Sequence, residues 1–233
     1  MTTFVLVHGA WHGPWAWDRV VPLLHRAGAR TVTPDLNAAA DAGLHDHAEE
    51  VASALDAVHG PDSVFLVGHS YAGLAVREAA DIRPDLVDHI VLVDGWAGAH
   101  GESLLDLAPP AFADAVHAAA DERGAGRVVP PPAPSAFGVT DPADAVWLAQ
   151  RLRPQPLRSF TEPTRLSGAV NRIPGTALCC RPHAYPFDRF AEAAGYRTQP
   201  LDAAHDVPLT DPETLAALLL HTASTGPVRE QEA

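Results

Sequence analysis

The stretch FLVGHSYAGL, residues 65–74, places one serine between two different hydrophobic patterns. The continuous apolar run before it is typical of a parallel strand buried on both faces. The apolar residues after it follow a helical period. Gly68 and Ala72 lie two residues on either side of Ser70, and small residues there let a strand and a helix approach closely. The stretch therefore predicts a tight strand-to-helix turn that exposes the Ser70 hydroxyl above a sheet.

Ser70 at such a turn fits a nucleophile, because the start of the following helix offers a positive dipole end to a developing oxyanion. A serine that only caps the helix would give the same local pattern. Glycine is the usual residue at the position of Ala72, and the motif is too common by itself to assign a role. The nucleophile hypothesis therefore depends on a base, an acid and a second N–H donor elsewhere in the chain.

Strand-like and helix-like segments alternate along most of the chain. This alternation predicts an α/β fold with a mostly parallel six-stranded sheet, helices on both faces and right-handed crossovers. The predicted strands are residues 3–7, 30–33, 63–67, 89–93, 176–180 and 197–201. The predicted helices are residues 15–27, 45–59, 72–81, 187–194 and 211–222, the last one capped by Thr210.

Residues 97–173 interrupt the alternation and are too long for a plain crossover. They contain two short helical stretches, 110–121 and 142–152, around a proline-rich segment. We expect one domain over residues 1–233, in which 97–173 form a helical cap insertion over the carboxyl edge of the sheet, where open α/β sheets bind ligands. The tail 224–233 is expected to be disordered.

The composition is that of a globular domain, with 47% hydrophobic and 19% charged residues among 233. A net charge of -13 and the absence of lysine disfavour nucleic acid and anionic membranes as partners. The two cysteines, Cys179 and Cys180, are adjacent and therefore predict no disulfide. No signal peptide or membrane span is recognisable, so a cytoplasmic location is expected. Monomer and homodimer are equally compatible with the sequence.

A second N–H donor is expected in the loop after the first strand. Tyr71 would supply one backbone N–H to an oxyanion, and the tight His-Gly turn that follows residues 5–7 makes Ala10 the candidate for the other. His8 and His12 lie in this loop, but they are not on a helix, so we expect structural roles for them. We expect neither a metal nor a cofactor.

Together these motifs resemble the α/β-hydrolase superfamily. The resemblance rests on His8-Gly9-Ala10, on the turn at residues 68–73 and on a histidine loop before the last helix, and it spans residues 3–222. Residues 4–17 are similar to the branch that contains plant methyl esterases, hydroxynitrile lyases and small bacterial esterases. The resemblance implies an α/β-hydrolase fold with the catalytic base on the loop after the last strand. His205 occupies that loop.

The acid of the triad is less clearly placed. The resemblance implies a carboxylate after the strand 176–180, but the first one there is Asp188, which lies where a helix cap is expected. Asp94 ends the strand 89–93, and some α/β hydrolases carry the acid at that position. We favour Asp94 as the acid, with Asp188 or no acid as alternatives. Asp206, next to His205, is expected to support the loop.

Three functions remain open from the sequence. The first is a serine hydrolase that cleaves an ester, thioester or lactone through an acyl-enzyme on Ser70. The second is a lyase or biosynthetic enzyme that uses the triad for acid–base chemistry, and the third is a non-catalytic small-molecule binder. A cyanohydrin lyase is disfavoured, because those relatives have threonine at the position of Gly9 and lysine after the catalytic histidine, where this chain has Asp206.

Aromatic residues indicate an apolar pocket. Trp11, Trp96 and Trp147 fall on loops or insertion segments near the expected site, and the insertion adds Phe112, Phe137 and Phe160. Aromatic side chains commonly line small-molecule pockets, although these could equally form the core of the insertion. A methyl ester of an aromatic acid or a polyketide-like lactone is the substrate hypothesis that follows.

Overall fold

Six parallel strands form the centre of the molecule in a computed structural model that describes residues 1–58 and 60–225. The spatial order is β2-β1-β3-β4-β7-β8, and every neighbouring pair is parallel, so the predicted sheet is confirmed and is wholly parallel. The strands are β1 (Thr2–Val7), β2 (Arg30–Val32), β3 (Ser63–His69), β4 (His89–Val93), β7 (Gly175–Cys180) and β8 (Arg197–Leu201).

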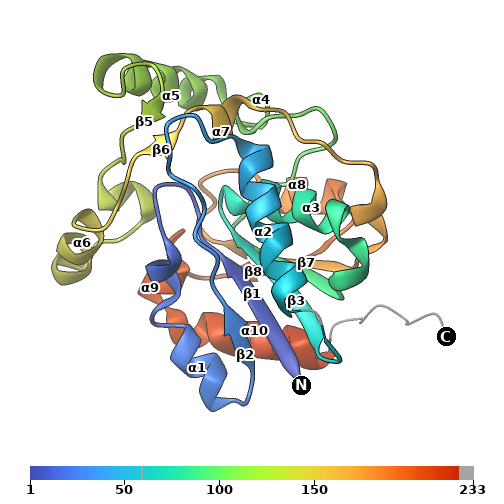
Figure 1. Ribbon diagram of the computed structural model, residues 1–233. Helices are drawn as coiled ribbons and strands as arrows, with labels where there is room; N and C mark the ends of the chain where they lie inside the picture. The colour runs from blue at the N-terminus through green and yellow to red at the C-terminus, as the bar shows by residue number, and fades with distance from the viewer. Residues whose placement is uncertain (59, 226–233) are drawn as a thin grey trace.

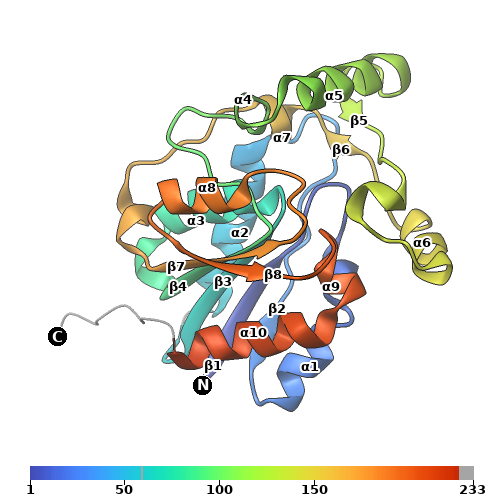
Figure 2. The same cartoon turned by 180° about the vertical axis from the view of Figure 1, so that it is seen from behind.

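Helices cover both faces of this sheet (Figure 1 and Figure 2). The main ones are α1 (Val21–Arg26), α2 (Leu44–Val58), α3 (Ala72–Ile82), α8 (Phe187–Ala193) and α10 (Pro212–Thr225). Helices α2, α3 and α8 share one buried apolar cluster with the sheet, and α1 and α10 share the cluster on the opposite face. Because both faces are covered, the central strands are continuous apolar runs, as the sequence indicated.

The segment between β4 and β7 extends beyond the carboxyl end of the strands (Figure 1). Its elements are α4 (Leu104–Leu107), α5 (Pro110–Arg123), β5 (Val128–Val129), η3 (Pro134–Phe137), α6 (Pro142–Ala149), β6 (Gln155–Pro156), α7 (Arg158–Thr161) and η4 (Ala169–Arg172). The short antiparallel pair β5–β6 was not predicted from the sequence. The pair carries the start of the proline-rich segment. A hydrogen bond holds this segment next to the loop after β1: the Trp11 indole N–H donates to the Val129 carbonyl at 2.9 Å.

Two predicted helices differ from the observed helices at their N-terminal ends. The predicted helix 15–27 is interrupted: η1 (Pro14–Trp17) is followed by a turn, and α1 begins only at Val21, with a proline in its first turn that cannot continue a preceding helix. The predicted Thr210 cap is also wrong. Thr210 ends a separate short helix, α9 (Val207–Thr210), and α10 is capped by Asp211, which accepts the Thr214 N–H at 3.2 Å.

The predicted disordered tail, residues 224–233, is wrong at its first two residues. Ser224 and Thr225 belong to α10, and residues 226–233 lie outside the described part of the chain. His59, the predicted last residue of α2, also lies outside it. A short 3₁₀ helix, η2 (Pro84–Leu86), joins α3 to β4.

The two cysteines are free thiols at the end of β7. Both side chains are buried, and burial raises the pKa of Cys179 to about 12, so this thiol stays protonated at neutral pH. Within residues 1–58 and 60–225, no helix has the length and apolar character needed to cross a bilayer. The same residues contain no cluster of three or more His, Cys, Asp or Glu side chains arranged to hold a metal ion.

Candidate active site

Ser70 occupies a sharp turn between β3 and α3. Its φ of +54° lies in the left-handed region that a residue with a side chain rarely adopts. Hydrogen bonds hold this conformation: the Ser70 N–H donates to the Val93 carbonyl at 3.1 Å, and the Ser70 carbonyl accepts the N–H groups of Gly73 and Trp96 at 3.0 and 3.1 Å. Such over-determined backbone strain is concentrated at functional sites. This turn directs the Ser70 hydroxyl toward the carboxyl edge of the sheet.

Close packing explains which small residues surround the turn. A Cβ at Gly68 would lie 2.9 Å from the Ala72 carbonyl oxygen, and a Cβ at Gly73 would lie only 2.2 Å from the Trp96 carbonyl oxygen. Both positions therefore require glycine. Ala72, the departure from the usual motif, is fully buried and its methyl group fits without displacing the turn. The motif thus keeps glycine at the two positions where backbone meets backbone.

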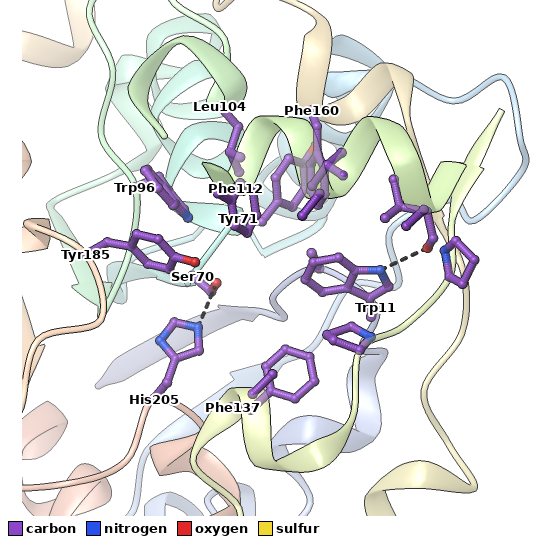
Figure 3. Close-up of a pocket in the computed structure, with 18 of the residues that line it drawn as sticks. Trp11, Ser70, Tyr71, Trp96, Leu104, Phe112, Phe137, Phe160, Tyr185 and His205 are labelled. Atoms are coloured by element: carbon purple, nitrogen blue, oxygen red, sulfur yellow. Dashed lines mark hydrogen bonds between the residues drawn. The ribbon is translucent and has the colours of Figure 1, made fainter. Parts of the chain in front are cut away.

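His205 lies within hydrogen-bonding distance of Ser70 and Asp94. Its Nε2 is 3.0 Å from the Ser70 Oγ, and its Nδ1 is 2.6 Å from the Asp94 Oδ2 (Figure 3 draws the first of these). Because Nδ1 faces a carboxylate, it carries the ring proton and donates it, which leaves Nε2 as an acceptor for the Ser70 hydroxyl. Phe187 stacks on the ring at 5.8 Å between centroids and restricts its orientation.

Asp94 occupies the end of β4 in a second strained conformation, with φ of +45°. The carboxylate is 2% exposed, and its two oxygens have different partners. Oδ1 accepts the backbone N–H of Cys180 at 2.9 Å, and Oδ2 accepts from His205. The strand β7, after which the resemblance implies an acid, therefore contributes a backbone donor instead. Asp188 lies elsewhere, with its Oδ2 3.5 Å from His183 Nε2.

Ala10 and Tyr71, the two residues expected to donate backbone N–H groups to an oxyanion, both line the cavity over Ser70. Within the described residues, neither N–H donates to a protein acceptor. The Tyr71 side chain is buried, with its hydroxyl 2.7 Å from His47 Nδ1. Two unused donors beside Ser70 are what an oxyanion-binding site requires.

His12 and Asp206 connect the β1 loop to the His205 loop. His12 Nδ1 is 2.7 Å from the Ala10 carbonyl oxygen, and its Nε2 is 3.3 Å from the Asp206 Oδ2. Both side chains are almost completely buried. Burial opposes ionisation of Asp206, but the charge and hydrogen bond of His12 outweigh it and lower the pKa of the carboxyl. The pair fixes the Ala10 peptide relative to His205, in keeping with the supporting roles expected for both residues.

An apolar cavity of about 360 Å³ opens over Ser70 (Figure 3). Trp11 and Trp96 line it, as expected, and so do Phe112, Phe137 and Phe160 of the insertion. Trp147 does not. It packs edge-on against Trp15 at 5.5 Å and lies under Arg151, so the expectation that it lines the pocket is corrected. Helix α6, which carries Trp147, packs onto η1 and η3 outside the cavity.

The cavity also includes residues that the sequence analysis missed. Tyr185, from the segment between β7 and α8, lies near Ser70 in Figure 3, and Phe187, the first residue of α8, stacks on His205. Pro130 and Pro132 of the proline-rich segment also line the cavity. The signal for the first pair was available: Tyr185-Pro186-Phe187 follows a predicted strand at the carboxyl edge of the sheet, where ligands bind.

Two buried histidines make the fold sensitive to acid. Burial lowers the pKa of His69 to about 3 and that of His47 to about 4, from 6.5. In this range the unfolded state binds protons on these histidines, but the folded state does not. The stability that the neutral histidines contribute is therefore fully present above pH 6.5 and is lost as the pH falls toward their pKa values in the folded state. We expect the free energy of unfolding, measured in urea, to fall between pH 6.5 and 4.5 by up to about 1.4 kcal/mol per pH unit for each histidine. His47→Gln, whose amide can replace both hydrogen bonds, should reduce this slope. A stability that does not change over this range would contradict the prediction.

Comparison with known proteins identifies the family to which this fold belongs. A parallel sheet with a serine at the turn after β3, a histidine in contact with that serine and an aspartate in contact with the histidine is typical of α/β hydrolases. Residues 4–218 match the alpha/beta hydrolase family, and the chain belongs to that family. The resemblance and the fold class stated from the sequence are thereby confirmed.

Two proteins are similar to this chain in sequence, and a third is similar in fold. The carbendazim hydrolyzing esterase of Nocardioides sp. (strain SG-4G) is 31% identical over 94% of this chain and 98% of its own. Methylesterase 2 of Arabidopsis thaliana is 35% identical over 40% of this chain and 39% of its own. An extracellular alpha/beta-hydrolase from a Paenibacillus species, described as homologous to tobacco salicylic acid binding protein 2, has a TM-score of 0.83 at 20% identity. That alignment covers 95% of this chain and 98% of the other.

Proposed function

We propose that this protein hydrolyses esters of small apolar or aromatic molecules through an acyl-enzyme on Ser70, with His205 as base and Asp94 as acid. Its family and its esterase relatives make it a hydrolase that acts on esters. The observation that carries the finer proposal is the 3.0 Å contact between His205 Nε2 and Ser70 Oγ at the wall of an apolar cavity. No cofactor takes part in the proposed reaction.

The proposed reaction has two stages. Ser70 Oγ attacks the carbonyl carbon while its proton passes to His205 Nε2, and Asp94 stabilises the imidazolium that forms. The oxyanion of the tetrahedral intermediate accepts the N–H groups of Ala10 and Tyr71. The intermediate collapses, the alcohol leaves with the proton from His205, and the acyl group stays on Ser70. A water molecule, deprotonated by His205, then attacks the acyl carbon and releases the acid and free Ser70.

The cavity favours an aromatic or other apolar acyl group. Most of its lining is aromatic or aliphatic, and its volume of about 360 Å³ suits a small molecule. Trp96, Phe112 and Tyr185 lie together on one side of Ser70, with Trp96 and Tyr185 ring centroids 5.1 Å apart. Among the described residues, Arg123 is the one arginine that lines the cavity. A methyl ester of an aromatic acid is the substrate class that these walls fit best.

The cyanohydrin-lyase alternative finds little support around Gly9. A Cβ at this position would lie 3.1 Å from the Ser70 Cβ and 3.1 Å from His69 Nδ1. A threonine there, as in the lyases that the motifs resemble, would require the Ser70 turn to move. Asp206, which follows His205, is buried against His12 and offers no cation to a leaving cyanide. These contacts favour hydrolysis over cyanohydrin cleavage.

A fluorophosphonate tests the proposal directly, since it reacts with a serine only when a base activates it. We expect intact-mass measurement to find one adduct on the wild-type protein and none on Ser70→Ala. Hydrolysis of an aromatic methyl ester should exceed that of a methyl ester with a charged acyl group. A folded protein without an adduct after hours of exposure would reject the acyl-enzyme on Ser70.

A further inference from the structure

A second cavity, of about 610 Å³, lies between α3, the segment after β4, η4 and α8. Leu166, Asn171 and Phe190 are among the residues that line it. It is separate from the cavity over Ser70, because Trp96, which lines that cavity, stacks on Phe190 at 5.5 Å between ring centroids. The two aromatic side chains form a wall between the cavities.

Arg77, on α3, places a buried positive charge at this second cavity. The residue is 4% exposed, and its partners are neutral. Its Nε donates to the Tyr196 hydroxyl at 3.3 Å, its Nη1 donates to the Gly98 carbonyl, and its guanidinium lies 5.7 Å from the centre of the Tyr196 ring. Burial raises the pKa of Tyr196, so the phenol remains uncharged and does not neutralise the arginine.

The carboxylates that share helix α3 with Arg77 or line the second cavity are engaged elsewhere. Glu78 and Asp81 are on α3 with Arg77, and Glu102 lines the cavity. Each accepts a backbone N–H: Glu78 from Arg165 at 2.9 Å, Asp81 from Val170 at 2.8 Å and Glu102 from Ala99 at 2.7 Å. Within residues 1–58 and 60–225, no carboxylate oxygen lies within 4.0 Å of the Arg77 guanidinium. Arg77 is thus a buried cation without a counter-ion from the described chain.

We propose that this second cavity binds a small organic carboxylate, with the anion on Arg77 and the apolar part against Leu166 and Phe190. An unpaired buried charge is strongly unfavourable, and an external anion offsets it. A guanidinium is suited to the task, because its planar N–H groups bind a carboxylate in fixed geometry. The Asn171 amide, which has no side-chain hydrogen bond to the rest of the described chain, lies in the same lining and supplies a further donor.

Hexanoate and its uncharged analogue hexanamide are suitable probes, since they differ in charge but not in length. Ligand-observed NMR titration of the wild-type protein should give at least tenfold tighter binding of hexanoate. Arg77→Gln should weaken hexanoate binding at least tenfold and leave hexanamide unchanged. Equal binding of the two probes, or no detectable binding at millimolar hexanoate, would overturn the proposal.

A matched pair of cavity-filling variants locates the binding and does not disturb the buried arginine. Ala193 is an exposed residue of the second cavity, and Ala115 is an exposed residue of the cavity over Ser70. Ala193→Trp should abolish hexanoate binding, and Ala115→Trp should retain it. The opposite pattern would show that the carboxylate occupies the catalytic cavity and would reject the second site. This pair decides the question even if Arg77→Gln does not fold.

Discussion

Ser70→Ala is expected to lower kcat for ester hydrolysis at least about a thousandfold. The Ser70 hydroxyl is the group that His205 Nε2 contacts, and alanine has no oxygen to attack the ester carbonyl. The backbone turn should survive, because its hydrogen bonds to Val93, Gly73 and Trp96 use main-chain atoms. Initial rates on an aromatic methyl ester measure the change.

An exposed serine of the insertion provides the control for this variant. Ser135 lies in η3, next to the pocket residues Ala136 and Phe137, but does not itself line the cavity. Ser135→Ala should keep the wild-type kcat, and urea titration should give both variants the stability of the parent. A Ser70→Ala protein that retained a tenth or more of the parent rate would mean that another nucleophile, or a mechanism without one, operates.

The sequence was sufficient to predict the sheet because its central strands, β1, β3, β4 and β7, are buried on both faces. Each central strand is therefore a continuous apolar run, and helices with a different period separate the runs. Local signals also located Ser70 at its turn, where glycine is required by contacts within 30 residues of chain. Hydrophobic periodicity cannot predict the path of an insertion made of short elements. For that reason the sequence analysis wrongly placed Trp147 in the lining of the pocket.

The choice of the triad acid shows the same limit of sequence analysis more clearly. Asp94 and Asp188 both follow predicted strands, so the sequence alone could rank them but not decide between them. In the folded chain the distinction depends on contacts that are distant in sequence. His205 is 111 residues from Asp94, and Cys180 is 86 residues from it. The parallel order β4-β7-β8 brings these three strand ends together at one edge of the sheet. No local sequence pattern indicates that they lie close together.

Asp94→Asn is accordingly expected to reduce kcat about ten-thousandfold, although the site should keep its shape. Oδ1 of Asp94 accepts the Cys180 N–H, so the asparagine will place its carbonyl oxygen there and turn its NH₂ toward His205. His205 Nδ1 must then accept, and the ring proton moves to Nε2. In that tautomer Nε2 cannot take the proton of Ser70. Asparagine also tolerates the positive φ at this position, so the variant should fold.

Asp188→Asn is the matched control for the acid. Its carboxylate contacts His183, on the segment after β7, and it should retain nearly the full rate. Rates for both variants with the same aromatic ester, and fluorophosphonate labelling of each, separate the alternatives. If Asp188→Asn were slow and Asp94→Asn fast, the acid would have to reach His205 by a rearrangement of residues 181–188. If both were fast, His205 would act without an acid, and the 2.6 Å contact with Asp94 would serve only to hold the loop.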